Sequence, residues 1–514
     1  MELIKKNVRL SCVEKNVKKM KTMDEDMNVP ELKGDINKII CSTHEAVIEN
    51  MKASDRKEAL KGYVEFDILY LNSENGKLEH LEGKYPFEET FEMEEGVFAG
   101  NVRGRVEIED FTVKIINSRK VNIKSLLAIS CFGDEINEEE IVIDVGDEDI
   151  LVNKENMVFS QIKADGEDTF RIKEDIELPK NKPNVLNVIW SDMRLKSRET
   201  RLLDDGVYIK GDIGIFIIYT PDNDDEMTQW YETAVPFEGK IEVNGVSEEM
   251  FSIVPLRLQE TSVTIKPDYD GEERVISAEG IIKVEIKAYS EEETPVVWDM
   301  YSTTSHVDMK SSDKRFQQMV MKNCLKARGY NKYKISETDE KPLQICYAYG
   351  EAHLERVLMS DEGMMVEGFV DVTVVYISTD DEGPMASFSC QVPFSQEIGM
   401  DEKILEPDYS INLCVDQINA SMISGDEIEV RVFVGIEVLM MKVMTRRFIT
   451  QAEKVLMTDK ELASFPGIIG YIASNEETLW DIAKRYKTTV EKIRSVNKIS
   501  GDCVKRGDKL LITR

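Results

Sequence analysis

One pattern of glycine, tyrosine and a Pro-Phe pair occurs three times in the chain and constrains its fold more than any other feature. The copies begin as GYVEFDILYL at Gly62, GDIGIFIIYT at Gly211 and GFVDVTVVYI at Gly368. In every copy the tyrosine lies eight residues after the glycine, and the proline lies 16 or 17 residues after the tyrosine. The copies start 149 and 157 residues apart. Because that distance is the size of a whole domain, the pattern indicates tandem domains and not a solenoid of short repeats.

Apolar side chains alternate along each copy with the period of two that is typical of a β-strand. The residues on this apolar face are Val64, Phe66, Ile68 and Tyr70; Ile213, Ile215, Ile217 and Tyr219; and Val370, Val372, Val374 and Tyr376. Since the tyrosine is on the apolar face, we expect its ring in a core and its hydroxyl hydrogen-bonded at the rim. The Pro-Phe pair indicates a strand end or edge, because proline lacks a ladder donor. We interpret both features as parts of the fold and not of a binding pocket.

The segments downstream of each copy also carry strand patterns, without a regular helix between them. Strands in such runs predict a mainly β chain of three tandem antiparallel domains, each a sandwich or a partly open barrel. We place these domains at residues 29–160, 170–305 and 335–450, and a different module at 466–514.

Two segments between the copies differ in composition. Residues 133–149 are strongly acidic, which favours a linker or a solvated edge. Within residues 311–328 apolar side chains recur at helical spacing, which predicts a short amphipathic helix that packs on its own domain or docks a partner. These side chains belong to Phe316, Met319, Val320, Cys324 and Ala327.

Composition excludes several classes of function. The 514 residues carry a formal net charge of −33, which disfavours binding along nucleic acid or an anionic membrane. The charge-free run at residues 462–475 is too short for a membrane-spanning helix, and the first 21 residues lack the apolar core of a secretory signal. Eight scattered cysteines without a C-x-x-C pair favour a reduced, cytosolic chain.

No pattern points to catalysis, a metal or a cofactor. The four histidines stand apart from one another and from the cysteines, which argues against a metal site. An enzyme with paired carboxylates is a possible class, but 98 acidic residues produce such pairs by chance. The chain also lacks a phosphate-binding Gly-rich loop and a nucleophile elbow. We therefore predict a non-enzymatic protein without catalytic residues, metal or cofactor.

The last fifty residues have a pattern of their own: strand, helix, helix, strand. A strand is expected at 471–473 and another at 509–512, with a loop at 497–507. The first helix is expected to start at Thr478, whose hydroxyl caps an N–H near Asp481, and Asp481 can pair with Arg485 one turn later. Thr488 is expected to cap the second helix. The apolar stripes are Leu479, Ile482, Ala483 and Tyr486 in the first helix, and Val490, Ile493 and Val496 in the second.

The phrases TLWDIAKRY, TTVEKIRSVN, ISGD and RGDKLLI in this module closely resemble the LysM domain over about 45 residues. The resemblance implies a small βααβ fold that binds N-acetylglucosamine-containing glycans in a groove between two loops, here residues 474–478 and 497–502. LysM domains usually carry Gly-Asp-Thr where this chain has Glu476, Glu477 and Thr478. The change removes a site of close backbone approach and adds a carboxylate to the groove rim, which is consistent with a protein ligand.

The resemblance defines a candidate partner-binding groove. Its residues are Tyr471, Ser474, Asn475, Glu476, Glu477, Trp480, Asn497, Ile499, Ser500 and Gly501. Trp480 is either a binding hot spot or a residue that packs on its own module. Residues 466–514 hold ten Lys and Arg against six Asp and Glu, so this basic module on an acidic body suits the capture of an acidic surface by electrostatic steering. A merely soluble module of mixed charge is the alternative.

Three β-rich repeats followed by one LysM module resemble the SipL-type spore-coat morphogenetic proteins. The resemblance covers the chain from about Val29 to Arg514. It implies an assembly factor in the mother-cell cytosol, located at the forespore surface, whose LysM module binds the coat-basement ATPase SpoIVA. Other coat proteins or a second copy of the chain are further candidate partners for the repeats.

A peptidoglycan-binding LysM protein of the cell wall or cortex is the competing function. The absence of an export signal in the first residues counts against it, because a wall-binding protein has to leave the cytosol.

Overall fold

The computed structural model describes residues 1–54, 57–92, 102–223, 228–335, 340–360, 363–379, 385–400, 404 and 407–514. Each of the three repeats is a sandwich of two antiparallel sheets, which confirms the predicted fold class. In the first repeat one sheet has the order β2-β3-β4 and the other β1-β6-β5, which a pairing of Leu10 with Gln161 joins to the sheet of the second repeat. The strands are β1 (Leu3–Asn28), β2 (Ile36–Ser54), β3 (Lys57–Asn72), β4 (Leu78–Glu92), β5 (Val102–Asn117) and β6 (Lys120–Val145).

The second and third repeats have the same topology. Sheet β8-β9-β10 faces β7-β13-β12, and sheet β15-β16-β17 faces β14-β19-β18, while the short β11 also pairs with β13. The strands of the second repeat are β7 (Ile150–Glu177), β8 (Val185–Leu203), β9 (Gly206–Pro221), β10 (Gln229–Glu242), β11 (Phe251–Ile253), β12 (Leu256–Pro267) and β13 (Glu273–Ser302). Those of the third are β14 (Ser305–Lys334), β15 (Pro342–Met359), β16 (Gly363–Ser378), β17 (Met385–Gly399), β18 (Pro407–Ser424) and β19 (Glu427–Leu456).

The repeated glycine and Pro-Phe pair occupy one register position in all three sandwiches. The glycine lies directly opposite the phenylalanine on the neighbouring strand, in the pairs Gly62↔Phe87, Gly211↔Phe237 and Gly368↔Phe394. A Cβ on any of these glycines would lie 2.7–2.8 Å from the phenylalanine ring. The glycine therefore lets an aromatic side chain cover the facing backbone, which accounts for the recurrence of the pair.

The repeated tyrosine is fully buried, and its hydroxyl donates to a main-chain carbonyl 36 residues earlier in the chain. The acceptors are the carbonyls of Gly34, Pro183 and Glu340, at 3.2, 3.4 and 3.0 Å. This confirms the expected partner at the rim, because each acceptor precedes the first strand of its three-stranded sheet.

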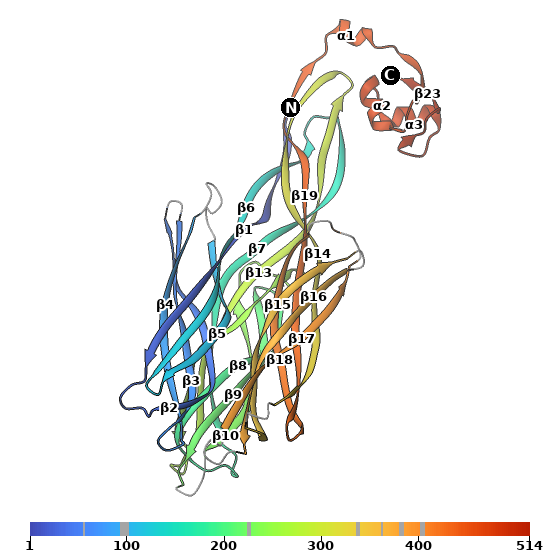
Figure 1. Ribbon diagram of the computed structural model, residues 1–514. Helices are drawn as coiled ribbons and strands as arrows, with labels where there is room; N and C mark the ends of the chain where they lie inside the picture. Colours follow the sequence, from blue (N-terminus) through green and yellow to red (C-terminus); the bar gives the residue numbers. More distant parts are fainter. Residues whose placement is uncertain are drawn as a thin grey trace.

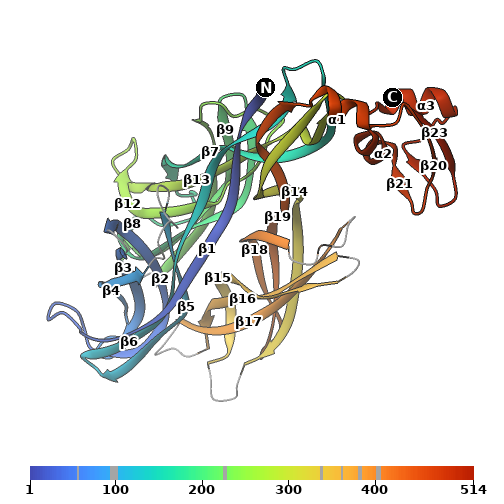
Figure 2. The same ribbon diagram turned by 90° about the horizontal axis from the view of Figure 1, so that it is seen from above.

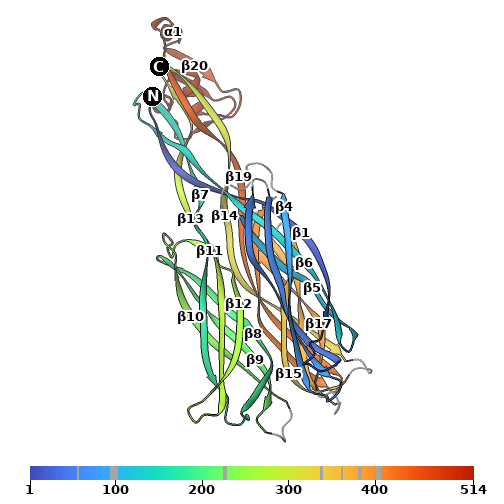
Figure 3. The ribbon, with the colours of Figure 1, turned by 90° about the vertical axis from the view of Figure 1, so that its left-hand side faces the viewer.

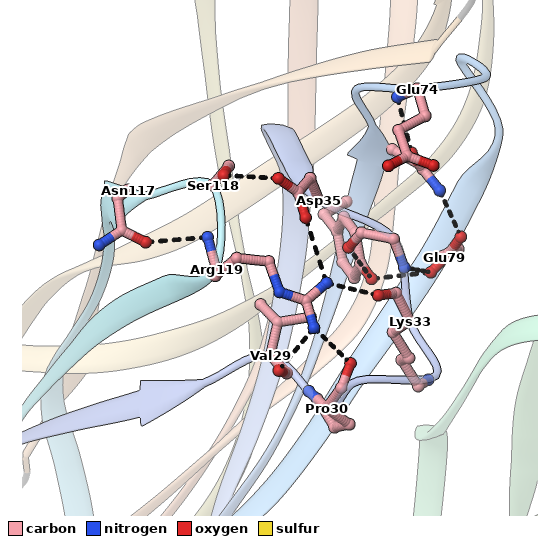
Figure 4. A network of polar contacts seen from close by, with 12 residues as sticks. Val29, Pro30, Lys33, Asp35, Glu74, Glu79, Asn117, Ser118 and Arg119 are labelled. Carbon is pink, nitrogen blue, oxygen red and sulfur yellow. Dashed lines mark hydrogen bonds and ion pairs between the residues drawn. The ribbon is translucent and has the colours of Figure 1, made fainter.

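In the first repeat an arginine also binds the segment that precedes strand β2 (Figure 4). The Arg119 guanidinium donates to the carbonyls of Lys33, Val29 and Pro30 and lies 3.2 Å from an Asp35 carboxylate oxygen. In the second repeat Arg274 donates in the same way to the carbonyls of Leu178 and Pro179. These bonds satisfy carbonyls of a non-ladder segment that would otherwise lose their hydrogen bonds.

The first and last strands of each repeat are much longer than the others, at 26 to 30 residues. Their far halves pair as three ribbons that extend beyond the sandwiches toward the C-terminal module (Figures 1 and 3). We call these ribbons the stalk, which comprises residues 3–14, 133–145, 150–162, 289–302, 305–319 and 440–456. One apolar cluster from all three ribbons holds them together: Val8, Ile141, Phe159, Val296, Phe316 and Phe448.

The three sandwiches lie around a common axis (Figure 2), and a second shared cluster joins them there. It contains Trp190 and Phe216 of the second repeat, Tyr347 of the third, and Leu69 of the first. The Phe216 and Tyr347 rings stack with centroids 4.1 Å apart. The repeats are therefore packed against one another in this axial cluster and in the stalk.

One of the two alternatives for residues 133–149 is wrong. Residues 133–149 are not a linker, because β6 continues to Val145 and pairs with β1 as far as Leu3. Ile141 and Val142 in this acidic segment are buried, so apolar side chains hold it in the stalk. The predicted domain boundaries remain proposals, and the first predicted domain, 29–160, does not include strand β1.

The helix expected within 311–328 is also wrong, since this segment is part of β14. β14 pairs with β19 along its whole length, which satisfies the backbone without a helix. A register shift between Met319 and Met321 interrupts the alternation of faces. Phe316 packs in the stalk, whereas Ala327 packs in the third sandwich. This break in the period of two produced the helix-like spacing.

The C-terminal module has the βααβ order that the LysM resemblance implies, preceded by α1 (Asp459–Ser464). Its elements are β20 (Ile468–Ile472), β21 (Glu477–Thr478), α2 (Leu479–Tyr486), α3 (Val490–Asn497), β22 (Cys503–Val504) and β23 (Lys509–Thr513). β20 pairs with β23, and Leu479, Ile482, Ala483 and Ile493 are buried against this sheet.

The helix caps follow the sequence with one correction. Thr478 caps α2 by accepting from the Asp481 N–H at 3.1 Å, as expected. The cap of α3 is Thr489, which accepts from the Lys492 N–H, and not Thr488. The expected loop at 497–507 contains the short strand β22.

Candidate partner-binding site of the C-terminal module

The two loops expected to form the groove lie next to each other. β21 pairs with β22, which places Glu477 opposite Val504 and Thr478 opposite Cys503. The Leu479 N–H also donates to the Asp502 carbonyl at 2.7 Å. A main-chain ladder therefore holds the end of the first loop against the end of the second.

The predicted groove residues divide into two groups. One group is exposed at the tips of the loops and available to a ligand: Ser474, Asn475, Glu476, Ser500 and Gly501. The other group is half-buried and engaged within the protein: Tyr471, Glu477, Trp480, Asn497 and Ile499. Its members shape the site but offer less free surface.

Tyr471 and Glu477 belong to one polar cluster beside the first loop. The Tyr471 hydroxyl donates to Glu477 at 2.6 Å, and Arg485 approaches both groups at 3.2 and 3.3 Å. The hydrogen bond to the Glu477 carboxylate raises the pKa of Tyr471. Arg485 thus pairs with Glu477, so the expected pair with Asp481 is wrong; Asp481 accepts from the Thr478 hydroxyl at 2.6 Å instead.

Asn497 and Ile499 hold the second loop in place. The Asn497 side chain donates to the carbonyls of Ile493 and Leu511 and accepts from the Leu511 N–H, which ties α3 to β23. Ile499 packs against the core of the module. Both side chains position the loop.

A shallow pocket opens beside the first loop, on the side of α2. It is lined by Glu476, Glu477, Thr478, Asp481, Lys484, Arg485 and Cys503. Sequence reasoning named the two glutamates but missed the α2 side chains, although their i, i+4 spacing from Asp481 to Arg485 placed them on one helix face. With three carboxylates and two cations, the pocket can make charge-assisted hydrogen bonds to a polar ligand.

Trp480 lies outside this pocket and contacts the stalk. Its indole N–H donates to the Asp299 carboxylate at 2.7 Å, and its ring meets the edge of Tyr301 at a centroid distance of 4.8 Å. The sequence left Trp480 between a hot spot and a residue packed on its own module. The structure shows Trp480 packed against the core of its own module, which was one of these alternatives, together with a stalk contact that neither included.

The part of the chain that the structure describes contains no group of three His, Cys, Asp or Glu side chains arranged to hold a metal ion. Among the same residues no helix is long and apolar enough to cross a membrane.

The cysteine side chains that the structure describes are all unpaired, and burial raises the pKa of the Cys346 thiol to about 12. A thiol with a raised pKa is a poor nucleophile.

A protein built from three such sandwiches and a βααβ module is defined by its domains, and comparison with known families identifies them. Residues 35–116, 184–266 and 341–423 each match the SipL family, SPOCS domain, and residues 471–513 match the LysM domain. The chain is thus a SipL-type protein with three SPOCS domains and a C-terminal LysM domain, as its resemblance implied. Both are non-catalytic domain families. The SPOCS domain is linked to the spore coat, and the LysM domain is linked to binding. Neither the curated proteins nor the solved structures compared with the chain gave a match.

Proposed function

We propose that this chain is a non-enzymatic assembly factor of the spore coat, and that its LysM domain binds the coat-basement ATPase SpoIVA. It would act in the mother-cell cytosol at the surface of the forespore. The SPOCS domains support the link to the coat, and the LysM domain supports a binding role.

The exposed rim of the pocket carries the proposal of a protein ligand. Glu476 is exposed beside a pocket that already holds Glu477 and Asp481. Charged side chains at a rim set specificity and association rate in protein complexes. The three SPOCS domains form one elongated body with the LysM domain at its far end (Figure 1), which suits a scaffold that presents its binding module away from its bulk.

Co-purification of the full chain with SpoIVA tests this proposal. Glu476→Lys reverses a charge on the exposed loop without touching the core, so it is expected to weaken SpoIVA binding by about tenfold. Glu491→Lys is the matched control, because Glu491 is an exposed carboxylate of the same domain that does not line the pocket.

Equal binding by the wild-type chain and Glu476→Lys would move the interface away from this rim. Retention of the full chain on purified peptidoglycan, with loss of retention in Glu476→Lys, would favour the glycan-binding function instead. Absence of SpoIVA binding by every form would refute the assignment of the partner.

A further inference from the structure

The LysM domain is docked on the tip of the stalk through the face of α2 that carries Trp480. Besides the bond from Trp480, the Asp299 carboxylate accepts from the Lys484 ammonium at 2.6 Å. Asp299 is only 8% exposed, so its carboxylate is largely shielded from water, whereas the Lys484 side chain remains partly exposed. Charge-assisted bonds of this kind are stronger than neutral ones.

Tyr301 inserts more deeply than a surface contact requires. It is 2% exposed and belongs to the apolar core of the LysM domain, together with Leu479, Ile482 and Val504. Its hydroxyl donates to the Thr488 carbonyl at 2.8 Å, at the turn between α2 and α3. The domain therefore contains a pocket for an aromatic side chain, and the stalk fills it.

The backbone of the stalk presents the Asp299 and Tyr301 side chains as a pair. β13 has a register shift between Val297 and Asp299, which leaves Trp298 outside the ladder with β7. Beyond this irregularity Asp299 and Tyr301 are two residues apart on an extended strand, so they project to the same side. Trp298 remains 49% exposed beside the contact.

Cations of the LysM domain surround the end of this segment. Lys487 donates to the carbonyls of Ser302 and Ser305 at 3.3 Å, and Arg514 donates to that of Thr303 at 3.3 Å. Burial and the neighbouring charges of Lys484 and Arg514 lower the pKa of Lys487. This face thus concentrates positive charge on an acidic protein.

We propose that the Trp480 face of the LysM domain recognises an extended acidic-x-aromatic segment, that Asp299 to Tyr301 occupies it as an internal ligand, and that a partner segment of the same chemistry replaces the stalk. The partner's chemistry rests on the proposed function, whereas the recognition of the segment does not. In the docked state the LysM domain presents the loop rim but not Trp480.

The test uses the full chain with Asp299→Ala, which removes the acceptor of both Trp480 and Lys484. Loss of these two bonds to the carboxylate predicts a shift of at least about tenfold toward the undocked domain. We expect faster amide exchange in residues 479–488 and faster proteolysis in residues 457–467. Asp313→Ala is the matched control, because Asp313 is an exposed carboxylate of the same stalk. Unchanged exchange and proteolysis in Asp299→Ala would overturn the proposal.

A synthetic peptide of residues 295–303 is the probe for the vacated face. We expect it to bind Asp299→Ala more tightly than the wild-type chain, and to lose this binding when Trp480→Ala is added. Peptide binding that does not depend on Trp480 would contradict the proposed recognition. Competition between the peptide and SpoIVA would support the exchange of stalk for partner, and simultaneous binding would refute it. If SpoIVA binds no variant, the proposed function fails while the peptide still decides the recognition.

Discussion

Several charged side chains line a cavity near the axis of the molecule. A cavity between the sandwiches is lined by all three repeats, and Glu45, Arg194 and Glu351 lie on corresponding strands of the three sheets around it. Arg194 pairs with Asp192 at 2.7 Å and lies over the Tyr349 ring. The Arg194 guanidinium therefore interacts with a carboxylate and with an aromatic ring.

Glu45 is the member of this group whose pKa moves toward neutral pH. Burial, then the carboxylates of Glu65 and Glu351, raise its pKa to about 7, while Arg257 and Arg194 act in the opposite direction. A carboxyl whose pKa is raised by folding stabilises the folded state when protonated. That stability is lost as the pH rises from the unfolded value of about 4.5 to about 7.

Glu45→Gln is therefore expected to stabilise the protein at pH 8 but not at pH 4. The gain at pH 8 should be about 2 kcal/mol, since one pKa unit corresponds to roughly 1.4 kcal/mol and partial exposure reduces the effect. Urea denaturation at both pH values measures it. Glu31→Gln, at an exposed carboxylate, is the control, and an equal response of both variants to pH would contradict the prediction.

The individual elements show which local signals were sufficient. The strand period and the Thr478 cap were predicted correctly, because each depends on residues within a few positions of one another. The burial of the tyrosine follows from the same strand period, although its hydroxyl acceptor lies 36 residues earlier. The segment 311–328 was not, because its hydrogen-bond partners lie in β19, more than 100 residues later. The cap of α3 was displaced by one residue, since Thr488 and Thr489 carry the same cap chemistry.

The glycine–phenylalanine pair provides a test at the scale of the strand pair. In Gly368→Ala the new Cβ would lie 2.2 Å from the His353 carbonyl and 2.7 Å from the Phe394 ring. The strands or the ring must move, so we expect a loss of about 1–3 kcal/mol in the free energy of unfolding. Chemical denaturation measures this loss. Gly399→Ala has open space around its Cβ and should be close to neutral, and equal losses in both variants would contradict the explanation.

The whole molecule depends on contacts between repeats that no local pattern describes. Apolar clusters join all three sandwiches at the axis and all three ribbons in the stalk. Because these cores are shared, we expect the three SPOCS domains to unfold in one cooperative transition and not in three independent ones.

Trp190→Ala tests this cooperativity. Trp190 is 1% exposed in the axial cluster, and its truncation should cost about 3–5 kcal/mol. In calorimetry the single transition should move to lower temperature as a whole. Separate transitions, of which only one moves, would show that the repeats are independent.

The amino-acid sequence by itself determined the three antiparallel β repeats, the LysM domain and the exposed loops of its groove, while it left a sandwich and a partly open barrel as alternatives. Period-two alternation, capping residues and recurring spacings express these features within short stretches of chain, where local geometry decides them. Only the tertiary structure decided the stalk, the axial cluster and the place of Trp480. In the sequence Trp480 lies 181 residues from Asp299, and no periodicity reports which distant acceptor an indole N–H finds. That choice depends on how long strands, once paired, carry the two groups to the same point in space.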